Sequence, residues 1–212
     1  MNENDRTKLS AYASGQTMPK RRSKKPKRSK KVEQEQSKSQ KAPLLETELL
    51  PLEETRNVIF QPNEGPQTEF LAASEREVLY GGSAGGGKSY AMLADPLRYM
   101  GHPQFSGLLL RHTTEELREL IFKSQELYPK IWPGIKWSER KMQWTAPSGA
   151  RLWMSYLDRD EDVLRYQGLA FSWIGFDELT QWATPYAWNY MRSRLRSTAP
   201  DLPIFMRATT NP

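Results

Sequence analysis

The chain has 212 residues, of which 37% are hydrophobic and seven are Trp, enough for one domain with a substantial core. It has no Cys, and its two His residues are His102 and His112, which argues against a disulfide framework, a thiol nucleophile and a typical catalytic zinc site. The formal net charge is +6, no apolar run approaches the roughly 20 residues that cross a bilayer, and the N-terminus does not resemble a signal peptide. We therefore expect an intracellular protein without a membrane partner.

The basic charge is concentrated in an N-terminal arm, residues 1–42. This arm holds 13 Lys and Arg against 4 Asp and Glu, a balance of +9, whereas the remainder of the chain carries −3. Its run KRRSKKPKRSKK at 20–31 combines high charge with low hydrophobicity, which predicts disorder. Such an arm binds polyanions through counterion release or serves only as a solvated tail, and a nuclear-localisation signal is a third reading.

From residue 43 the composition becomes that of a globular domain, which we expect to span 43–212. An amphipathic stretch at 44–54 comes first. Buried strands are predicted at 75–82, 105–113, 172–178 and 202–212, a hairpin at 142–157, and helices at 89–100, 113–131 and 185–197. Thr113 or Thr114 is expected to cap the second helix, and Pro96 to bend the first. Strands that alternate with helices indicate an α/β domain with a mainly parallel central sheet flanked by helices.

The segment LYGGSAGGGKSYAML, residues 79–93, holds a glycine-rich loop between an apolar strand and a helix. It fits the pattern G-x-x-x-x-G-K-[ST], in which backbone amides turn inward to cradle phosphate oxygens. In such a loop Lys88 reaches the β- and γ-phosphates, and Ser89 places its hydroxyl on Mg²⁺. The predicted phosphate-binding residues are Gly82, Ser83, Ala84, Gly85, Gly86, Gly87, Lys88 and Ser89. A flexible turn is the alternative, but the flanking strand and helix favour binding of a nucleoside triphosphate.

Two acids, Asp177 and Glu178, follow the apolar run WIGF. An Asp at the carboxyl end of a buried strand beside a phosphate loop can hold the magnesium, directly or through water. The adjacent Glu178 can polarise a water for in-line attack on the γ-phosphate. A kinase that acts on a small molecule should avoid such a base, because it would waste ATP on water, so the pair favours hydrolysis. The alternative is that the two acids only cap a helix.

Several ordered motifs together resemble the ATPase domain of the large terminase subunit, the DNA-packaging motor of tailed bacteriophages. They are PNEGPQTEFLAASEREVLYGGSAGGGKSYAML, GLLLRHTTEELREL, DVLRYQGLAFSWIGFDELTQW and RATTNP, and the likeness covers about residues 58–212. The resemblance implies a P-loop NTPase fold of the ASCE type, in which an additional strand lies between the phosphate-loop strand and the acidic strand. It also implies ATP as the nucleotide.

The resemblance suggests roles for four residues outside the phosphate loop and the acidic pair. Gln67, in GPQ, would be the adenine-reading residue, since an amide can pair with N6 and N7 of adenine. Thr209, Thr210 and Asn211, in ATTNP, would sense the γ-phosphate as a coupling motif. An ordinary polar loop residue and a simple turn are the respective alternatives.

The family also uses an arginine that acts on the site of a neighbouring subunit, where its permanent charge offsets that of the transition state. Many members carry it immediately before the glycine that here is Gly168, but this sequence has Gln167 at that position. The role therefore passes to Arg165, the nearest arginine. Three arginines of the helix predicted at 185–197 are rivals: Arg192, Arg194 and Arg196. A plain surface role is the alternative for each of these arginines. Arg111, after the second strand, could face DNA or bind phosphate, and the sequence does not decide between these roles.

With the resemblance, these residues predict an ATPase that requires Mg²⁺ and drives double-stranded DNA into a viral procapsid. Its catalytic residues would be Lys88, Glu178 and Arg165, with Mg²⁺ held between Ser89 and Asp177. The resemblance implies a homo-oligomeric ring, a portal protein and a small terminase subunit as partners, and the host cytoplasm as the location. A helicase-like ATPase that acts on nucleic acid and a nucleotide-binding scaffold without turnover are the two rival functions.

Two further features bear on DNA. The family normally continues into a nuclease domain with clustered carboxylates, whereas this sequence stops just after RATTNP, so we expect an ATPase domain incomplete at its C-terminus and assign it no DNA cleavage. Four tryptophans could stack on bases, but their alternating apolar neighbours favour packing in the core and the hairpin. They are Trp132, Trp137, Trp144 and Trp153.

Overall fold

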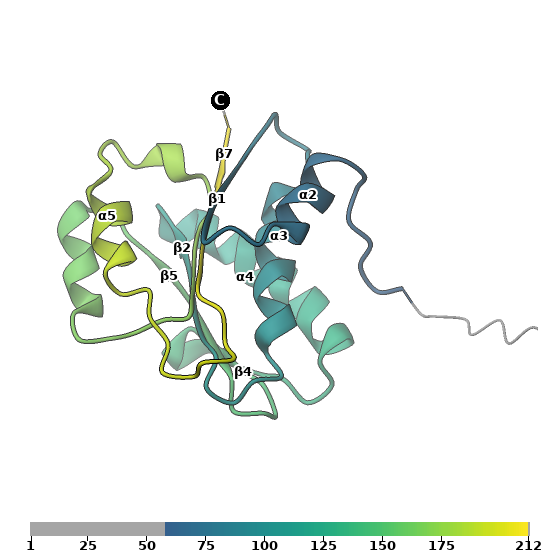
Figure 1. Ribbon diagram of the computed structural model, residues 1–212. Helices are drawn as coiled ribbons and strands as arrows, with labels where there is room; N and C mark the ends of the chain where they lie inside the picture. Colours follow the sequence, from purple (N-terminus) through teal and green to yellow (C-terminus); the bar gives the residue numbers. More distant parts are fainter. Residues whose placement is uncertain (1–57, 212) are drawn as a thin grey trace, which may run out of the picture. The chain divides into compact units, whose positions relative to one another are not determined.

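The computed structural model describes residues 58–211, an α/β fold built on one seven-stranded sheet (Figure 1). Its strands are β1 (Glu77–Gly81), β2 (Ser106–Arg111), β3 (Lys136–Ser138), β4 (Gln143–Thr145), β5 (Arg151–Tyr156), β6 (Trp173–Phe176) and β7 (Phe205–Thr210). Its helices are α2 (Pro66–Ala72), α3 (Lys88–Ala94), α4 (Thr114–Ile131) and α5 (Tyr186–Arg192), with short 3₁₀ helices η2 (Asp95–Tyr99), η3 (Glu139–Lys141), η4 (Asp160–Tyr166) and η5 (Leu179–Gln181). The arm predicted at 1–42, the stretch at 44–54 and the domain start at residue 43 lie outside the described residues.

The strands of the sheet follow the order β1-β7-β6-β2-β5-β4-β3. The first five pair in parallel, and β4 and β3 extend the sheet antiparallel at one edge, with β4 and β5 forming the predicted hairpin. β7 lies between β1, which precedes the glycine-rich loop, and β6, which precedes the acidic pair. The inserted strand that the resemblance implied is therefore confirmed, as is the mainly parallel sheet.

Both faces of the sheet are covered, because residues of the central strands alternate between two apolar cores. In β2, Leu109 contributes to the core formed with α3 and α4, whereas Leu108 and Leu110 contribute to the core formed with α5. β6 alternates in the same way, with Trp173 in the first core and Phe176 in the second. Figure 1 shows α2, α3 and α4 on one side of the sheet and α5 on the other.

The helices begin and bend where the sequence indicates. Thr113 is the N-cap of α4: its hydroxyl accepts from the Glu116 N–H at 3.3 Å, and the Glu116 carboxylate accepts from the Thr113 N–H at 3.3 Å. α3 changes to the 3₁₀ helix η2 at Asp95, one residue before Pro96. The bend predicted at Pro96 is therefore a change of helix type. None of the helices within residues 58–211 has the length and apolar character that a membrane span requires.

The helix predicted at 185–197 is shorter in the structure, because α5 ends at Arg192. The residues that follow form an isolated parallel bridge between Leu195 and Phe171. In this bridge the Arg196 N–H donates to Phe171 O at 2.8 Å, and the Phe171 N–H donates to Arg194 O at 3.0 Å. Arg194 and Arg196 therefore do not lie on the helix, and the prediction that placed them there is wrong.

The four tryptophans pack against the cores of the fold. Trp144 is buried, and its indole N–H donates to Ser124 Oγ at 3.0 Å. The ring of Trp137 lies 5.2 Å from that of Trp144, centroid to centroid, and Trp132 and Trp153 are partly buried against the two cores. Packing in the core and the hairpin is confirmed.

We expect Gly175→Ala to lower the free energy of unfolding by about 1–3 kcal/mol, the usual cost of overpacking a core. A Cβ on Gly175 would lie 2.3 Å from Cη2 of Trp173, whose buried indole is held by a hydrogen bond to Asp95. Urea denaturation followed by circular dichroism measures the change. Gly81→Ala in β1 is the matched control, because the nearest atom to its Cβ would be Thr210 Cγ2 at 3.8 Å. Equal stability of the Gly175→Ala variant and the parent protein would contradict this description of the packing.

Candidate functional site

Four strand ends converge at one edge of the sheet. β1, β7, β6 and β2 are adjacent and parallel, so the residues that follow them meet beyond their carboxyl ends. These residues are the glycine-rich loop after β1, Asn211 after β7, and Asp177 and Glu178 after β6, while Arg111 ends β2. The fold therefore brings the phosphate loop, the acidic pair and the end of the coupling motif, which are distant in the sequence, into one site.

The glycine-rich loop bends where glycine is required. Gly85 and Gly87 have φ values of 86° and 75°, in the left-handed region. A Cβ on Gly87 would also lie 2.6 Å from Nε2 of Gln67. The Tyr80 hydroxyl holds the loop by donating to Gly86 O at 2.7 Å, and burial raises the pKa of this phenol above its usual value. The loop has the backbone form that a phosphate cradle requires.

Lys88 is buried, and its ammonium group lies inside the loop. Its Nζ donates to Gly82 O at 2.8 Å, to Ser83 O at 2.8 Å and to Asn211 Oδ1 at 2.6 Å. An ammonium carries three hydrogens, so all of them are engaged. The charge is thus held at the loop by neutral acceptors, which phosphate oxygens can replace.

Ser89 and Asp177 lie together, as ligands of one magnesium ion must. The Ser89 hydroxyl donates to Asp177 Oδ2 at 3.3 Å, and Asp177 is fully buried. The other oxygen, Oδ1, accepts from the hydroxyl of Thr209. A hydroxyl and a carboxylate are the hard oxygen donors that suit Mg²⁺, which completes its shell with phosphates and waters. The residues fit this ion, and within residues 58–211 no group of three His, Asp or Glu side chains forms an all-protein metal site.

Glu178 has an uncommon backbone conformation. Its φ of 60° and ψ of 55° are left-handed, and the other non-glycine residue with a positive φ among residues 58–211 is Met142. The Glu178 N–H donates to Thr209 Oγ1 at 3.0 Å. Its carboxylate accepts from Asn211 twice, from the backbone N at 3.1 Å and from Nδ2 at 3.0 Å. Conformations of this kind persist where the surrounding contacts impose them, and they cluster at active sites.

The three residues of the predicted coupling motif have different surroundings. Thr209 is buried behind the two acids, and Thr210 points to Thr180, whose hydroxyl oxygen lies 2.7 Å from its own. Asn211 reaches the loop, and its side-chain amide bridges the loop lysine and the second acid. Contact with the γ-phosphate stays a prediction for all three, and Asn211 is the one that lines the cavity over the loop.

This cavity has a volume of about 490 Å³, within the range of small-molecule sites. It is lined by Ala84, Gly85, Gly86, Gly87, Lys88, Ser89, Tyr90, Glu119, Lys123, Glu178 and Asn211. The sequence did not indicate Glu119 or Lys123 as site residues, since an acid and a base one helical turn apart in α4 resemble an ordinary surface pair. Lys123 Nζ donates to Glu119 Oε1 at 2.6 Å, and this hydrogen bond, with the lysine charge, holds the pKa of Glu119 below its usual value.

Gln67 lies against the loop from α2 and is buried. Its Nε2 donates to Gly87 O at 2.8 Å, and its Oε1 accepts from the Asn63 N–H at 2.6 Å. A second hollow of about 260 Å³ adjoins it. The adenine contact stays a prediction, and in the present arrangement the Gln67 amide joins the start of α3 to the segment before α2.

The predicted arginine finger does not line the cavity over the loop. Arg165 lies in η4, where it donates to Tyr156 O at 2.7 Å and to Asp162 O at 3.2 Å. Its side chain is about half exposed, so a neighbouring molecule can approach it. Arg192, a rival for this role, pairs with Glu77 at 2.5 Å. Action of Arg165 on a neighbouring subunit stays a prediction.

Arg111, whose role the sequence left undecided, is buried beside the acidic pair. Its Nε lies 3.0 Å from Oδ2 of Asp177, and its side chain is 9% exposed. The alternative in which Arg111 faces DNA is therefore wrong. The sequence held one signal for this contact. Arg111 directly follows the apolar residues of one predicted buried strand, and Asp177 directly follows those of another. If these two strands are neighbours, the opposite charges at their ends attract each other.

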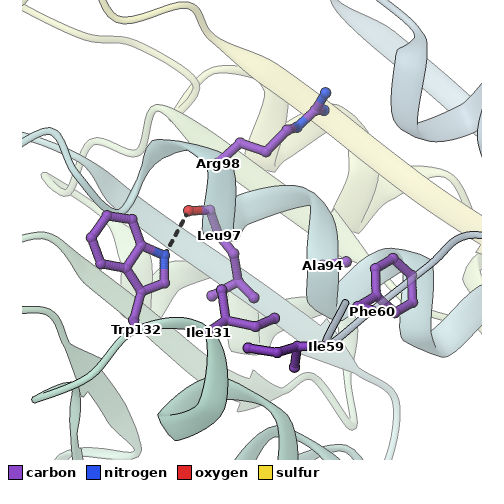
Figure 2. Close-up of a pocket in the computed structure, with 7 residues that line it drawn as sticks. All are labelled: Ile59, Phe60, Ala94, Leu97, Arg98, Ile131 and Trp132. Carbon is purple, nitrogen blue, oxygen red and sulfur yellow. Dashed lines mark hydrogen bonds between the residues drawn. The ribbon is translucent and has the colours of Figure 1, made fainter. Parts of the chain in front are cut away.

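An apolar hollow of about 500 Å³ lies elsewhere, between the ends of η2 and α4 (Figure 2). Its lining consists of Ile59, Phe60, Ala94, Leu97, Arg98, Ile131 and Trp132. The Trp132 indole donates to Leu97 O at 3.1 Å, while Figure 2 shows the Arg98 guanidinium extending away from the apolar side chains. That guanidinium is engaged by Asp95 and by Leu71 O. The hollow shares no residue with the phosphate loop or the acidic pair, and we assign no ligand to it.

Comparisons with known proteins identify the family. Residues 79–212, more than half of the chain, match the family model described as terminase large subunit, T4likevirus-type, N-terminal. No curated protein matches the sequence.

Solved structures show the same fold. The large terminase from a thermophilic bacteriophage matches with a TM-score of 0.58 and 16% identity, over 72% of this chain and 40% of that chain. The large terminase ATPase domain of Thermus phage P74-26 matches with a TM-score of 0.51 and 12% identity, over 71% of this chain and 65% of that chain. A structure of the first of these terminases in complex with ADP matches with a TM-score of 0.52 and 16% identity, over 69% of this chain and 37% of that chain. This chain thus spans less than two thirds of each of those proteins.

We expect Gln67→Ala to weaken binding of ATP and GTP equally, by about tenfold, because it removes the hydrogen bond that holds the loop at Gly87 O and leaves the Asn63 N–H without its acceptor. Competition with a fluorescent ATP analogue measures both affinities. Glu69→Ala, at an exposed position of the same helix, is the matched control. A loss of ATP binding without loss of GTP binding would contradict this role and would support the adenine contact that the resemblance suggested.

Proposed function

We propose a motor function for this chain, which belongs to the family of T4-like terminase large subunits, N-terminal part. It hydrolyses ATP with Mg²⁺ and uses the reaction to move double-stranded DNA into a procapsid. The observation that carries this proposal is the bridge of Asn211 between Lys88 and Glu178. Asn211 is within hydrogen-bond distance of both the Lys88 ammonium and the Glu178 carboxylate, which supports one site in which Lys88 binds phosphate and Glu178 orients a water.

ATP binds in the cavity over the glycine-rich loop. The loop amides and the Lys88 ammonium hold the phosphates, and Lys88 exchanges its carbonyl and amide acceptors for phosphate oxygens. Ser89 and Asp177 are the residues that would hold Mg²⁺, which when bound supplies neutralisation of the phosphate charge. The ADP complex of the terminase from the thermophilic bacteriophage supports nucleotide binding by this chain, because the two proteins share a fold.

Glu178 orients the water that attacks the γ-phosphate and accepts its proton, so that ADP and inorganic phosphate form. Asn211 holds both oxygens of this carboxylate and also the Lys88 ammonium. When Lys88 turns to a phosphate, Asn211 loses one of its partners. The hydrogen bonds of Asn211, the residue that follows β7, therefore change when the nucleotide binds.

The remaining parts of the motor come from other molecules. Arg165, half exposed on η4, would complete the site of a neighbouring subunit in a homo-oligomeric ring. The family membership supports a portal protein and a small terminase subunit as further partners. The host cytoplasm is the location that we propose for this action.

We expect Glu178→Gln to reduce ATP hydrolysis by roughly 10²–10⁴-fold, the usual contribution of a general base, while ATP still binds. Phosphate release measures the first quantity and a fluorescent ATP analogue the second. Glu126→Gln, which removes the same charge from an exposed position of α4, is the matched control. Negligible hydrolysis by the parent protein together with retained binding would overturn the ATPase and support the nucleotide-binding scaffold.

We expect ATP-dependent protection of linear double-stranded DNA from an added nuclease when the protein is mixed with portal-bearing procapsids. The protection arises because translocated DNA lies inside the shell. The Glu178→Gln variant should give none. Separation of the two strands without procapsids would instead support the helicase-like function.

A further inference from the structure

We infer that Arg111 is a resident counter-cation of Asp177, which opposes metal binding at Ser89 and Asp177 until the phosphates of a nucleotide are present. This inference rests on the proposed function, because it concerns the same magnesium site. Arg111 is a positioning residue, because it acts through its contact with Asp177.

The sheet fixes Arg111 beside Asp177. β2 and β6 are parallel neighbours with Leu110 paired to Phe176, and the Asp177 N–H donates to Leu110 O at 3.0 Å. The next residues, Arg111 on one strand and Asp177 after the other, therefore lie side by side. Their Nε–Oδ2 distance is 3.0 Å, and Asp177 is fully buried. Little water is available to screen the two charges.

The oxygen that Arg111 contacts is the one that a metal would use. Asp177 Oδ2 accepts from the Ser89 hydroxyl, the other proposed ligand, whereas Oδ1 is engaged by Thr209. Arg111 Nε is buried and makes no hydrogen bond, so its contact with Oδ2 is one of charge and leaves that oxygen directed at Ser89. A guanidinium stays charged at every accessible pH, so a second cation at Oδ2 meets a permanent like charge.

A second acid, Glu116, weakens the repulsion between Arg111 and a metal ion at Asp177. Glu116 Oε1 lies 3.8 Å from Nη1 of Arg111 and accepts from Gln181 Nε2 at 2.6 Å. Burial opposes its ionisation, but the hydrogen bonds from Gln181 and Thr113 and the charge of Arg111 together hold the pKa of Glu116 below its usual value. Arg111 is thus shared between two carboxylates, and Glu116 offsets part of its charge. The negative phosphates of a nucleotide would offset it further, and the site would then accept a divalent cation.

Nucleotide-free binding of Mn²⁺ to the full chain tests the inference, with water proton relaxation enhancement as the readout because it detects millimolar affinities. We expect Arg111→Gln to tighten Mn²⁺ binding at least tenfold and Arg111→Lys, which keeps the charge, to leave it within a factor of about three of the parent value. Arg118→Gln removes the same charge from an exposed position of α4 and should leave the affinity unchanged. Adding Asp177→Asn to Arg111→Gln should abolish the gain. An Arg111→Gln variant that binds Mn²⁺ no tighter than the parent protein overturns the inference.

Glu116→Gln provides a test with the opposite sign, which serves also if Arg111→Gln does not fold. The Gln amide oxygen can accept from Thr113, and its NH₂ can donate to the Gln181 oxygen once the Gln181 amide turns over. The neutral amide no longer offsets Arg111, so Mn²⁺ should bind at least threefold more weakly. Circular dichroism confirms that the variant is folded, and an unchanged affinity overturns the inference. If the parent protein fails to bind ATP, the proposed function falls. If it binds ATP and these Mn²⁺ affinities do not move, only the role of Arg111 falls.

Discussion

The buried carboxylate of Asp177 is the constraint on which the rest of the site depends. A carboxylate without access to water is costly unless its oxygens are paired. Three distant parts of the chain supply the partners: the Ser89 hydroxyl after the phosphate loop, the Thr209 hydroxyl on β7 and the Arg111 guanidinium on β2. These groups meet only when β7 and β2 flank β6, as they do in the sheet. Electrostatics and packing therefore favour the same order of strands.

The same arrangement explains the position of Glu178. Thr209 serves both acids, because its hydroxyl donates to Asp177 and accepts from the Glu178 N–H. Asp177 consequently stays inside while the chain turns sharply at Glu178, in a left-handed conformation that costs about 1–3 kcal/mol. The hydrogen bonds from Asn211 to the Glu178 carboxylate help to offset this cost. The result is one buried acid suited to a metal and one acid at the cavity suited to a water.

Local patterns in the sequence predicted the parts of this site but not the contacts between them. The glycine spacing, the apolar run before Asp177 and the cap at Thr113 each depend on neighbouring residues, and each element was placed correctly. The bridge from Lys88 through Asn211 to Glu178 depends on which strands are neighbours in the sheet. Short sequence patterns do not encode the order of strands, so the inserted strand was predicted from the family resemblance alone. Likewise α5 ends early because its continuation bridges to Phe171, a partner distant in the sequence. The surroundings of Arg165 in an assembly depend on a second molecule, which no pattern within one chain contains.

β7 connects the candidate site to a second buried charge pair, and this connection limits which residues can move first in response to a ligand. Arg207 in β7 is fully buried, and its Nε lies 3.5 Å from Oδ2 of Asp95, which also accepts from the Trp173 indole at 2.7 Å. Sliding β7 along the sheet would separate this pair and leave a charge uncompensated in the core, which is strongly destabilising. An exchange of partners at Asn211 therefore cannot be transmitted by moving the strand as a whole. In the proposed motor, the response to the nucleotide has to start in the residues that follow Thr210, where the chain leaves the sheet.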